Sequence, residues 1–240
     1  MGAKRCVHRG YAGNLGRAHD IETILDAIAA TQAEQTSRRR ASNTQAIRWI
    51  FIGGGAQFEA LKTAVARRKL DNVEFRGYQP RERLAESLSV ADVHLVSLRP
   101  ELEGLIVPSK FYGIAAAGRP TIFIGDEDGE IPRLLKKHEC GVPVPQGDAA
   151  GLVRVLMKLA GDPPLLGKMG ENARRAFDAE FSKSLAVARW DNMLRESLGS
   201  ATGVDASSRP KVENPASPQP SGASQDTNAC EARFHRRMVP

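Results

Sequence analysis

The loop that ends in Pro108-Ser109-Lys110 holds the residue types best suited to chemistry in this sequence. It follows an apolar stretch over residues 93–96 and precedes a helical pattern over residues 108–117, so it joins a strand to a helix. Free backbone N–H groups at a helix start bind anions, and the helix dipole disfavours a lysine in the first turn unless an anion is bound. The loop therefore predicts a diphosphate site made of the following residues: Leu105, Ile106, Val107, Ser109 and Lys110. The competing interpretation is an ordinary surface lysine.

Two glycine-bearing loops follow other strand patterns. Gly13-Asn14-Leu15-Gly16-Arg17 lies between a strand pattern over residues 7–12 and a helical pattern over residues 20–29. Small residues let backbone N–H groups approach a phosphate, and Arg17 adds a charge-assisted contact, although a plain tight turn is the alternative. The loop lacks the three spaced glycines of the dinucleotide fingerprint. For residues 53–55 (GGG), close packing of a strand on a helix explains the glycines as well as ligand contact does.

Other candidate chemistries are weaker. The acidic residues 126–130 suit a helix start better than a metal site, because acidic side chains are favoured at helix N-termini. His19 and His94 stand apart from other functional residues, and each is interpreted as structural or solvated. The three cysteines are widely spaced, which favours a reducing compartment over a disulfide framework. We therefore predict no catalytic residue, no metal site and no cofactor.

The elements that must position these loops alternate along the chain. Strand patterns occupy residues 46–52, 72–75, 93–96 and 120–124, and helical patterns occupy residues 56–70, 80–88, 108–117, 130–138, 149–160, 164–181 and 183–198. Strands that alternate with helices predict an α/β fold with a parallel sheet and helices on both faces. Ligands of such sheets bind beyond the carboxyl ends of the strands, where the loops above should gather.

Composition sets the domain organisation. The chain has 240 residues, 41% hydrophobic and 26% charged, which is typical of a globular protein. We expect one domain over residues 1–198 and a disordered tail over residues 199–240, which is rich in Ser, Pro and Gly. Residues 31–44 are interpreted as a solvated insert, or less favourably as a basic patch for lipid or nucleic acid.

Charge and hydropathy limit the partners. The net charge of +6 favours phosphate-bearing ligands, and the 5% aromatic content argues against a nucleic-acid stacking surface. No stretch approaches the roughly 20 apolar residues of a membrane span. The first residues lack the apolar core of a signal peptide, so a cytoplasmic location is expected.

The series of short motifs resembles the retaining glycosyltransferases of group 1 (family 4), which have the GT-B fold, and in particular the polysaccharide-biosynthesis type. The matching residues are 11–19 (YAGNLGRAH), 51–55 (FIGGG), 73–77 (VEFRG), 91–93 (ADV), 107–113 (VPSKFYG), 115–120 (AAAGRP), 129–131 (GEI) and 139–142 (ECGV). The resemblance implies two Rossmann-like domains, of which this chain matches the C-terminal, donor-binding one. Its first strand looks eroded by Arg5, His8 and Arg9, so the coding region looks truncated or split from a partner.

The resemblance also implies roles for residues. Diphosphate contacts would come from Gly13, Asn14, Gly16 and Arg17 with the loop that ends at Lys110, and the nucleobase and ribose would lie near Gly77, Tyr78 and Gly113. The family's two acidic residues, for the sugar and the ribose, fall on Leu105 and Gly113, so both carboxylates are missing, and Glu103 is out of register.

The implied function is binding of a UDP- or GDP-linked sugar for retaining transfer, without a metal, in cell-surface polysaccharide or lipid-linked oligosaccharide synthesis. An acceptor domain would act in trans, and the isolated half would be inactive. The alternative is a non-catalytic nucleotide-sugar-binding module or an inactive truncated gene product. A sugar-nucleotide epimerase lacks support because no acid–base pair suits it. Peripheral contact with the inner membrane is a further expectation.

Overall fold

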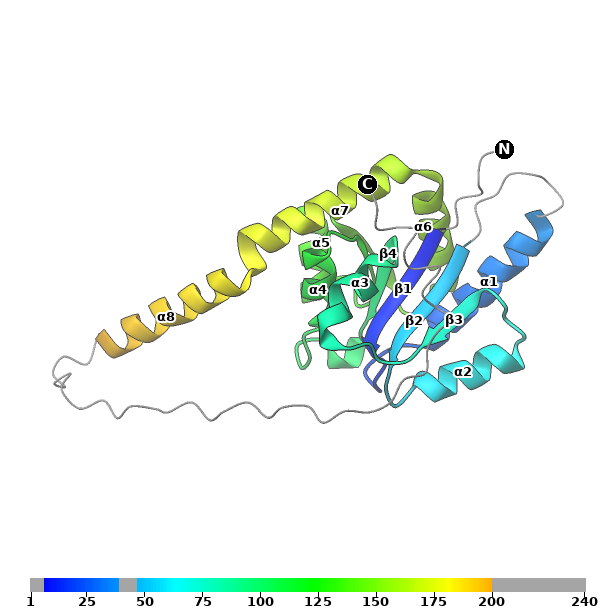
Figure 1. Cartoon of the computed structure of the whole chain (residues 1–240), viewed down its shortest axis with the longest axis horizontal. Coiled ribbons are helices and arrows are strands. Elements are labelled where there is room, and N and C mark those ends of the chain that lie inside the picture. Colours follow the sequence, from blue (N-terminus) through cyan, green and yellow to red (C-terminus); the bar gives the residue numbers. More distant parts are fainter. Residues whose placement is uncertain (1–6, 39–46, 200–240) are drawn as a thin grey trace. The chain divides into compact units, whose positions relative to one another are not determined.

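The computed structural model describes residues 7–38 and 47–199 (Figure 1). Residues up to Leu194 belong to one compact unit, and of the second unit only residues 195–199 are described. The strands are β1 (Val7–Asn14), β2 (Ile47–Gly54), β3 (Val73–Arg76), β4 (Val93–Ser97), β5 (Thr121–Gly125) and β6 (Gly141–Pro145). The helices are α1 (Glu22–Arg38), α2 (Phe58–Arg67), α3 (Leu84–Ser89), α4 (Lys110–Ala116), α5 (Glu130–His138), α6 (Ala149–Gly161), α7 (Pro163–Ala176) and α8 (Lys183–Gly199). Short helical turns occur at η1 (Arg81–Arg83), η2 (Pro100–Leu102) and η3 (Phe177–Phe181).

The six strands form one parallel sheet in the order β3-β2-β1-β4-β5-β6. From β1, the strands β2 and β3 follow on one side, whereas β4, β5 and β6 follow on the other side. The direction of the strand order therefore reverses between β1 and β4. Ligands of doubly wound sheets bind beyond the carboxyl ends of the strands at this switch point. We call that end of the sheet the carboxyl edge and the opposite end the amino edge.

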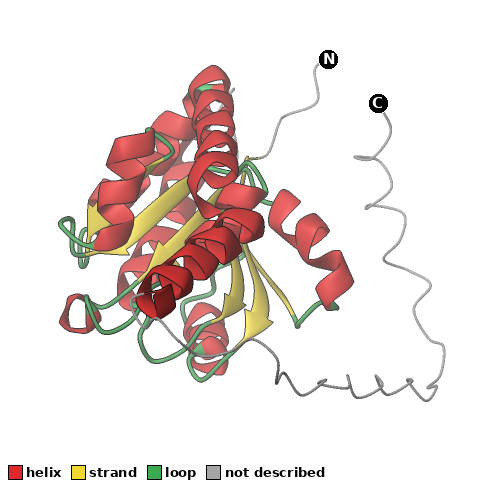
Figure 2. Ribbon diagram, turned by 90° about the vertical axis from the view of Figure 1, so that its left-hand side faces the viewer, coloured by secondary structure: helices red, strands yellow, loops and turns green. Residues whose placement is uncertain are grey.

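Helices cover both faces of the sheet (Figure 2). On one face, α1, α2 and α6 pack on strand residues that include Trp49 and Leu95. On the other face, α3, α4 and α5 pack on strand residues that include Val96 and Phe123. Neighbouring residues of β4 point to opposite faces, as the pleat of a strand requires. The fold is therefore the α/β sheet with two covered faces that the sequence predicts.

The first strand forms over Val7–Asn14, so the expectation that His8 and Arg9 interrupt it is wrong, and Arg5 lies outside the described residues. All eight residues of β1 pair with β2, from Val7 opposite Ile47 to Asn14 opposite Gly54. On its other side β1 also pairs with β4. A central strand is held by backbone hydrogen bonds to both neighbours, which polar residues in its sequence do not remove.

The proposed insert over residues 31–44 is also wrong in its first part, because α1 continues to Arg38. Thr31 is buried, and its hydroxyl oxygen accepts hydrogen bonds from Trp49 Nε1 at 3.0 Å and Asn72 Nδ2 at 3.1 Å. Buried polar atoms need such partners, so this threonine belongs to the core and not to a solvated loop. Residues 39–44 lie outside the described part of the chain.

The structure adds a strand that the sequence did not predict. Residues Gly141–Pro145 form β6 at the edge of the sheet and pair with β5. Prolines at 143 and 145 hide the strand pattern, but an edge strand tolerates proline because one side of its backbone stays unpaired. All but the first residue of the proposed tail over residues 199–240 lie outside the described residues. None of the described helices is long and apolar enough to cross a membrane.

Candidate functional site

Five residues meet at the switch point: Tyr11, Gly13, His19, Ser97 and Lys110. We call them the carboxyl-edge cluster. Tyr11 and Gly13 lie near the end of β1, Ser97 ends β4, and Lys110 begins α4. The β1–α1 loop carries His19 back over the end of β4, where the backbone N–H of Arg99 donates to the carbonyl of Ala18 at 2.9 Å.

Lys110 points toward β1. Its Nζ atom lies 5.2 Å from the centroid of the Tyr11 ring and 3.1 Å from His19 Nε2. A Cβ atom at Gly13, whose φ is +114°, would lie 3.1 Å from Lys110 Cε, so the glycine leaves room for the lysine. Burial lowers the pKa of Lys110. Among the described residues no carboxylate forms an ion pair with Lys110, so its charge is available to an external anion.

His19 is buried between β1 and β4. Its Nδ1 atom lies 2.6 Å from the backbone carbonyl oxygen of Ser97, and its ring meets the Tyr11 ring edge-on at 5.7 Å. Burial, and then the charge of Lys110, lowers the pKa of His19. Burial also raises the pKa of Tyr11, with a smaller contribution from Tyr78. The cluster therefore holds one cation among neutral groups.

The β1–α1 loop is fixed by α2. Gln57 Nε2 donates to the carbonyls of Gly16 at 2.7 Å and His19 at 2.9 Å, and the Gln57 backbone N–H donates to Leu15 at 3.0 Å. Leu15 in turn donates its N–H to the carbonyl of Gly54 at 2.7 Å. The loop is thus preorganised, with Arg17 exposed at its outer side.

Part of the predicted loop before α4 forms a hydrogen-bonded turn of its own. The backbone N–H groups of Leu105 and Ile106 both donate to the carbonyl of Leu102 at 3.1 Å, so these two donors are not free for a phosphate. The side chains of Leu105, Ile106 and Val107 are exposed, Leu105 by 77%. Ser109 takes the N-cap position without a side-chain capping bond, and α4 begins at Lys110, two residues later than predicted.

The predicted nucleobase and ribose residues lie on two elements, the loop after β3 and helix α4. Tyr78 is 66% exposed, and its ring covers Gly54, where a Cβ atom would lie 2.7 Å from Tyr78 Cε2. Gly77 is exposed, with no atom within 4 Å of the position of a Cβ. Gly113 lies one turn after Lys110 on α4, and a Cβ there would meet Leu88 at an ordinary 3.7 Å.

Glu103, the acidic residue near the missing motif position, has a different role. Its Oε1 atom accepts a hydrogen bond from the backbone N–H of Glu130 at 2.9 Å. It therefore stabilises the start of α5, where a negative charge is favoured. The helix start predicted for the acidic stretch is confirmed, since α5 begins at Glu130.

Sequence reasoning missed the contributions of Tyr11, His19, Ser97 and Gln57. His19 directly precedes Asp20, whose carboxylate accepts backbone hydrogen bonds from the first residues of α1. A residue in that position must lie at the carboxyl edge, and this was the available indication. His94, in contrast, is buried with Nε2 2.7 Å from the carbonyl of Leu88, as a structural histidine should be.

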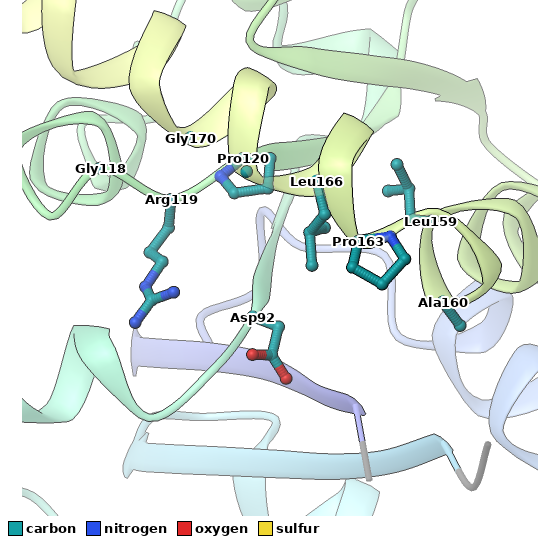
Figure 3. Close-up of a pocket in the computed structure, with 10 residues that line it drawn as sticks. Asp92, Gly118, Arg119, Pro120, Leu159, Ala160, Pro163, Leu166 and Gly170 are labelled. Atoms are coloured by element: carbon teal, nitrogen blue, oxygen red, sulfur yellow. The ribbon is translucent and has the colours of Figure 1, made fainter. Parts of the chain in front are cut away.

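A separate pocket lies at the amino edge, between α7 and the residues that precede β4 and β5 (Figure 3). Its lining includes Asp92, Arg119, Pro163 and Leu166. The cavity volume is about 160 Å³, whereas small-molecule sites usually measure roughly 300–1,000 Å³. Its size and its place opposite the carboxyl edge both argue against a nucleotide-sugar site.

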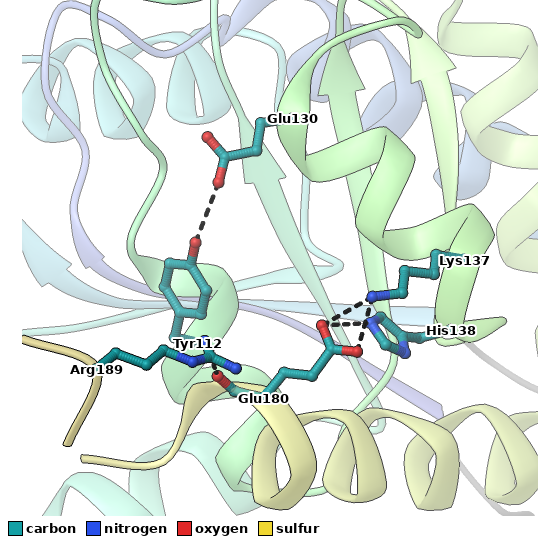
Figure 4. A network of polar contacts seen from close by, with 6 residues as sticks. All are labelled: Tyr112, Glu130, Lys137, His138, Glu180 and Arg189. Atoms are coloured by element: carbon teal, nitrogen blue, oxygen red, sulfur yellow. Dashed lines mark hydrogen bonds and ion pairs between the residues drawn. The ribbon is translucent and has the colours of Figure 1, made fainter. Parts of the chain in front are cut away.

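A polar network braces α4 and α5 (Figure 4). Glu180 accepts from Lys137 Nζ at 2.7 and 2.9 Å and lies 3.5 Å from His138 Nε2, which ties η3 to α5. Tyr112 donates its hydroxyl to Glu130 at 3.4 Å. Because Tyr112 lies two residues after Lys110, this contact holds the helix that carries the lysine.

A doubly wound parallel sheet, with a lysine and a glycine facing each other at its switch point, defines a Rossmann-like α/β domain. The family model of the group 1 glycosyl transferases matches residues 7–176. The chain belongs to this family.

Individual relatives agree with this assignment. The chain is 26% identical over 188 residues to the "Probable glycosyltransferase WbjE" of Pseudomonas aeruginosa, covering 78% of this chain and 44% of that protein. The chain is also 28% identical over 149 residues to the "Amylovoran biosynthesis glycosyltransferase AmsK" of Erwinia amylovora, covering 61% of this chain and 36% of that protein. The chain spans less than half of the length of these curated relatives, 44% and 36%.

Solved structures show the same fold. The C-terminal domain of the group 1 glycosyltransferase LpcC from Francisella tularensis has a TM-score of 0.57 at 17% identity, with 74% of this chain and 87% of that one covered. The complex of Anabaena HepE with UDP-glucose has a TM-score of 0.61 at 17% identity, with 81% and 49% covered. The fold is that of the C-terminal, Rossmann-like half of a GT-B glycosyltransferase.

Proposed function

We propose that the carboxyl-edge cluster binds the diphosphate of a nucleoside-diphosphate sugar, UDP- or GDP-linked. The observation that carries this proposal is the Lys110 ammonium group, half-buried at the switch point and paired with a neutral histidine and an aromatic ring. A partly desolvated cation without a carboxylate partner gains most from an anionic ligand. Structural neighbours with the same fold include a UDP-glucose complex, which supports this ligand class.

The other contacts follow from the surrounding loops. Gly13, Asn14 and Gly16 would bring backbone groups to the diphosphate, and Arg17 would add a second charge from solvent. Val107 and Ser109 lie beside Lys110, whereas Leu105 and Ile106 would offer backbone N–H groups only if their turn to Leu102 opened. Tyr78, lying over Gly54, would offer an aromatic face to the nucleobase, with the backbone of Gly77 beside it.

Backbone NMR tests where the nucleotide binds. Addition of UDP or GDP to the isotope-labelled chain should shift the amide resonances of Gly13, Gly16, Tyr78 and Lys110. Resonances of the amino-edge pocket, such as that of Gly118, serve as the internal control and should stay in place. Shifts confined to the amino-edge pocket would refute the proposed site.

Replacing Gly113 by glutamate should strengthen both the helix and the nucleotide contact. A side chain fits, because a Cβ meets Leu88 at 3.7 Å, and loss of a glycine inside α4 should stabilise folding by about 0.5 kcal/mol. A carboxylate at the position that the family uses for the ribose should tighten UDP binding about tenfold, the effect of one charged hydrogen bond.

Gly113→Gln is the matched control for that substitution, since it gains the helix stability without the charge. Denaturant unfolding and UDP titration measure the two effects separately. A Gly113→Glu protein that is more stable but binds UDP no more tightly than Gly113→Gln would exclude a ribose at Gly113.

We further infer that sugar transfer, with retained anomeric configuration, needs an acceptor-binding domain in addition to the donor-binding fold described above. The chain spans less than half of its curated relatives, and Leu105 and Gly113 replace both acidic positions of the family motif. The basic cluster would stabilise the departing diphosphate. A transfer assay with polyprenyl-linked sugar acceptors, read by product NMR, should give α-linked product from an α-linked donor only when an acceptor domain is added.

The missing carboxylates favour a second candidate, a nucleotide-sugar-binding module without catalysis. That protein would bind UDP-sugars as above and give no product with any added acceptor domain. We place either protein in the cytoplasm, with peripheral contact at the inner membrane, and cell fractionation tests this location.

A further inference from the structure

A histidine and a lysine share a hydrogen bond inside the carboxyl-edge cluster. His19 Nε2 lies 3.1 Å from Lys110 Nζ, and His19 Nδ1 lies 2.6 Å from the carbonyl oxygen of Ser97. A carbonyl oxygen only accepts hydrogen bonds, so Nδ1 carries the proton of the neutral ring and the lone pair on Nε2 accepts from the ammonium group. This pairing fixes a neutral imidazole whose Nε2 atom carries a lone pair and can accept a proton.

A diphosphate bound at Lys110 would draw away the donor that now satisfies His19 Nε2. We propose that nucleotide-sugar binding transfers one proton from solvent to His19 Nε2, and that the resulting imidazolium donates to a phosphate oxygen beside Lys110. No bond of the ligand is made or broken in this step, and the site gains one proton. The inference rests on the proposed donor site and adds a second phosphate contact to it.

The groups around His19 explain why the proton arrives with the ligand. The His19 ring contacts the ring of Tyr11 on β1 and the ammonium group of Lys110 on α4. The side-chain amide of Gln57, at the start of α2, donates to the backbone carbonyl of His19. The adjacent Asp20 carboxylate is turned into α1, where it accepts from Thr23. The backbone carbonyls of Ser97 and Asn14 favour the charged form of His19, but among the described residues no carboxylate pairs with it, so an imidazolium there would face Lys110 without a compensating negative charge.

The direction of the pH dependence follows from these surroundings. In the free protein, burial and Lys110 lower the pKa of His19 below its usual 6.5. The negative charge of a bound diphosphate acts in the opposite sense and raises the pKa. Between the free and the bound pKa, binding takes up a proton, so the Kd should rise by up to tenfold for each pH unit. Outside that interval the Kd should be independent of pH.

The experiment is calorimetric titration of the whole chain with UDP-glucose, in pairs of buffers with different ionisation enthalpies, from about pH 6 to about pH 8. UDP-glucose is the suitable probe because both of its phosphates are esterified, whereas the terminal phosphate of UDP itself titrates near about pH 6. We expect an uptake that approaches one proton per ligand at the lower pH, with the Kd rising as the pH rises.

His19→Gln is the diagnostic variant, because an amide can keep the hydrogen bonds but cannot titrate. Its proton uptake should vanish and its Kd should become independent of pH. His138→Gln, in the network of Figure 4, is the matched control and should keep the uptake of the unaltered chain. His94 stays neutral throughout, since burial lowers its pKa to about 4.

The outcomes separate the two proposals. Binding without proton uptake, or uptake that persists in His19→Gln, overturns the role of His19 and leaves the donor site intact. A His19→Gln protein that is weaker at every pH by the same factor, with uptake preserved, shows a merely structural histidine and also overturns the inference. Failure of the folded chain to bind UDP-glucose, UDP and GDP overturns the donor site and the inference together.

Discussion

Lys110→Ala is expected to weaken UDP binding by about 10- to 100-fold. A hydrogen bond to a charged group contributes about 1.5–3 kcal/mol, and each 1.4 kcal/mol is a factor of about ten in Kd. Lys110 is the cation of the cluster, and its side chain lies beside Gly13. Arg17 should contribute less to UDP binding, because it is exposed and solvent screens its charge. Calorimetric titration of the variant with UDP measures the loss directly.

Lys168→Ala is the control for this prediction, because it removes the same charge from an exposed position on α7. Its Kd should stay within about twofold of the unaltered chain, which shows how little the net charge alone contributes. Unfolding curves should show little change for Lys110→Ala, since removal of a half-buried charge also removes its desolvation cost. Equal Kd values for the two variants would exclude Lys110 from the phosphate site.

Gly53→Ala should destabilise the fold by about 2–4 kcal/mol, from backbone strain and overpacking together. Gly53 has φ of +133°, a conformation that side chains rarely adopt, and its Cβ would overlap the carbonyl oxygen of Gly13. The two glycines are opposite each other where β1 and β2 end. The substitution should therefore push the β1–α1 loop outward and weaken UDP binding as well as lower the Tm.

Gly77→Ala is the matched control for stability, because no atom lies within 4 Å of its Cβ position and the residue is exposed. Its free energy of unfolding should change by less than about 0.5 kcal/mol. Denaturant unfolding of both variants makes the comparison. A Gly53→Ala protein as stable as Gly77→Ala would mean that the ends of β1 and β2 do not approach as described.

Periodicity was sufficient to predict most of the sheet and the helices, because the buried strands are short apolar runs and the helices carry clear apolar stripes. It failed where other forces decide the structure. β6 contains two prolines and is held at the edge by β5, and β1 is held by backbone pairing on both sides. The middle of α1, beyond the predicted helical stripe, is held by a buried hydrogen bond between Thr31 and Trp49, which lies 18 residues further along the chain.

The site was predicted less completely than the fold. Lys110 could be predicted as a candidate phosphate contact, because a lysine in the first turn of a helix is unusual and because its neighbours in the motif are contiguous in the sequence. His19 could not, since its partners Ser97 and Lys110 lie 78 and 91 residues away along the chain. The donors expected from Leu105 and Ile106 are occupied for a different, local reason, because both N–H groups close a turn onto the carbonyl of Leu102, three and four residues earlier.

Titration of the folded, unaltered chain with UDP, GDP and UDP-glucose in a calorimeter tests the donor-site proposal most directly. We predict that at least one of these ligands binds to a single site with a Kd of about 1 mM or tighter, which corresponds to about −4.1 kcal/mol. Circular dichroism and a cooperative unfolding transition establish that the sample is folded. A folded chain that binds none of the three ligands would contradict the donor-site proposal.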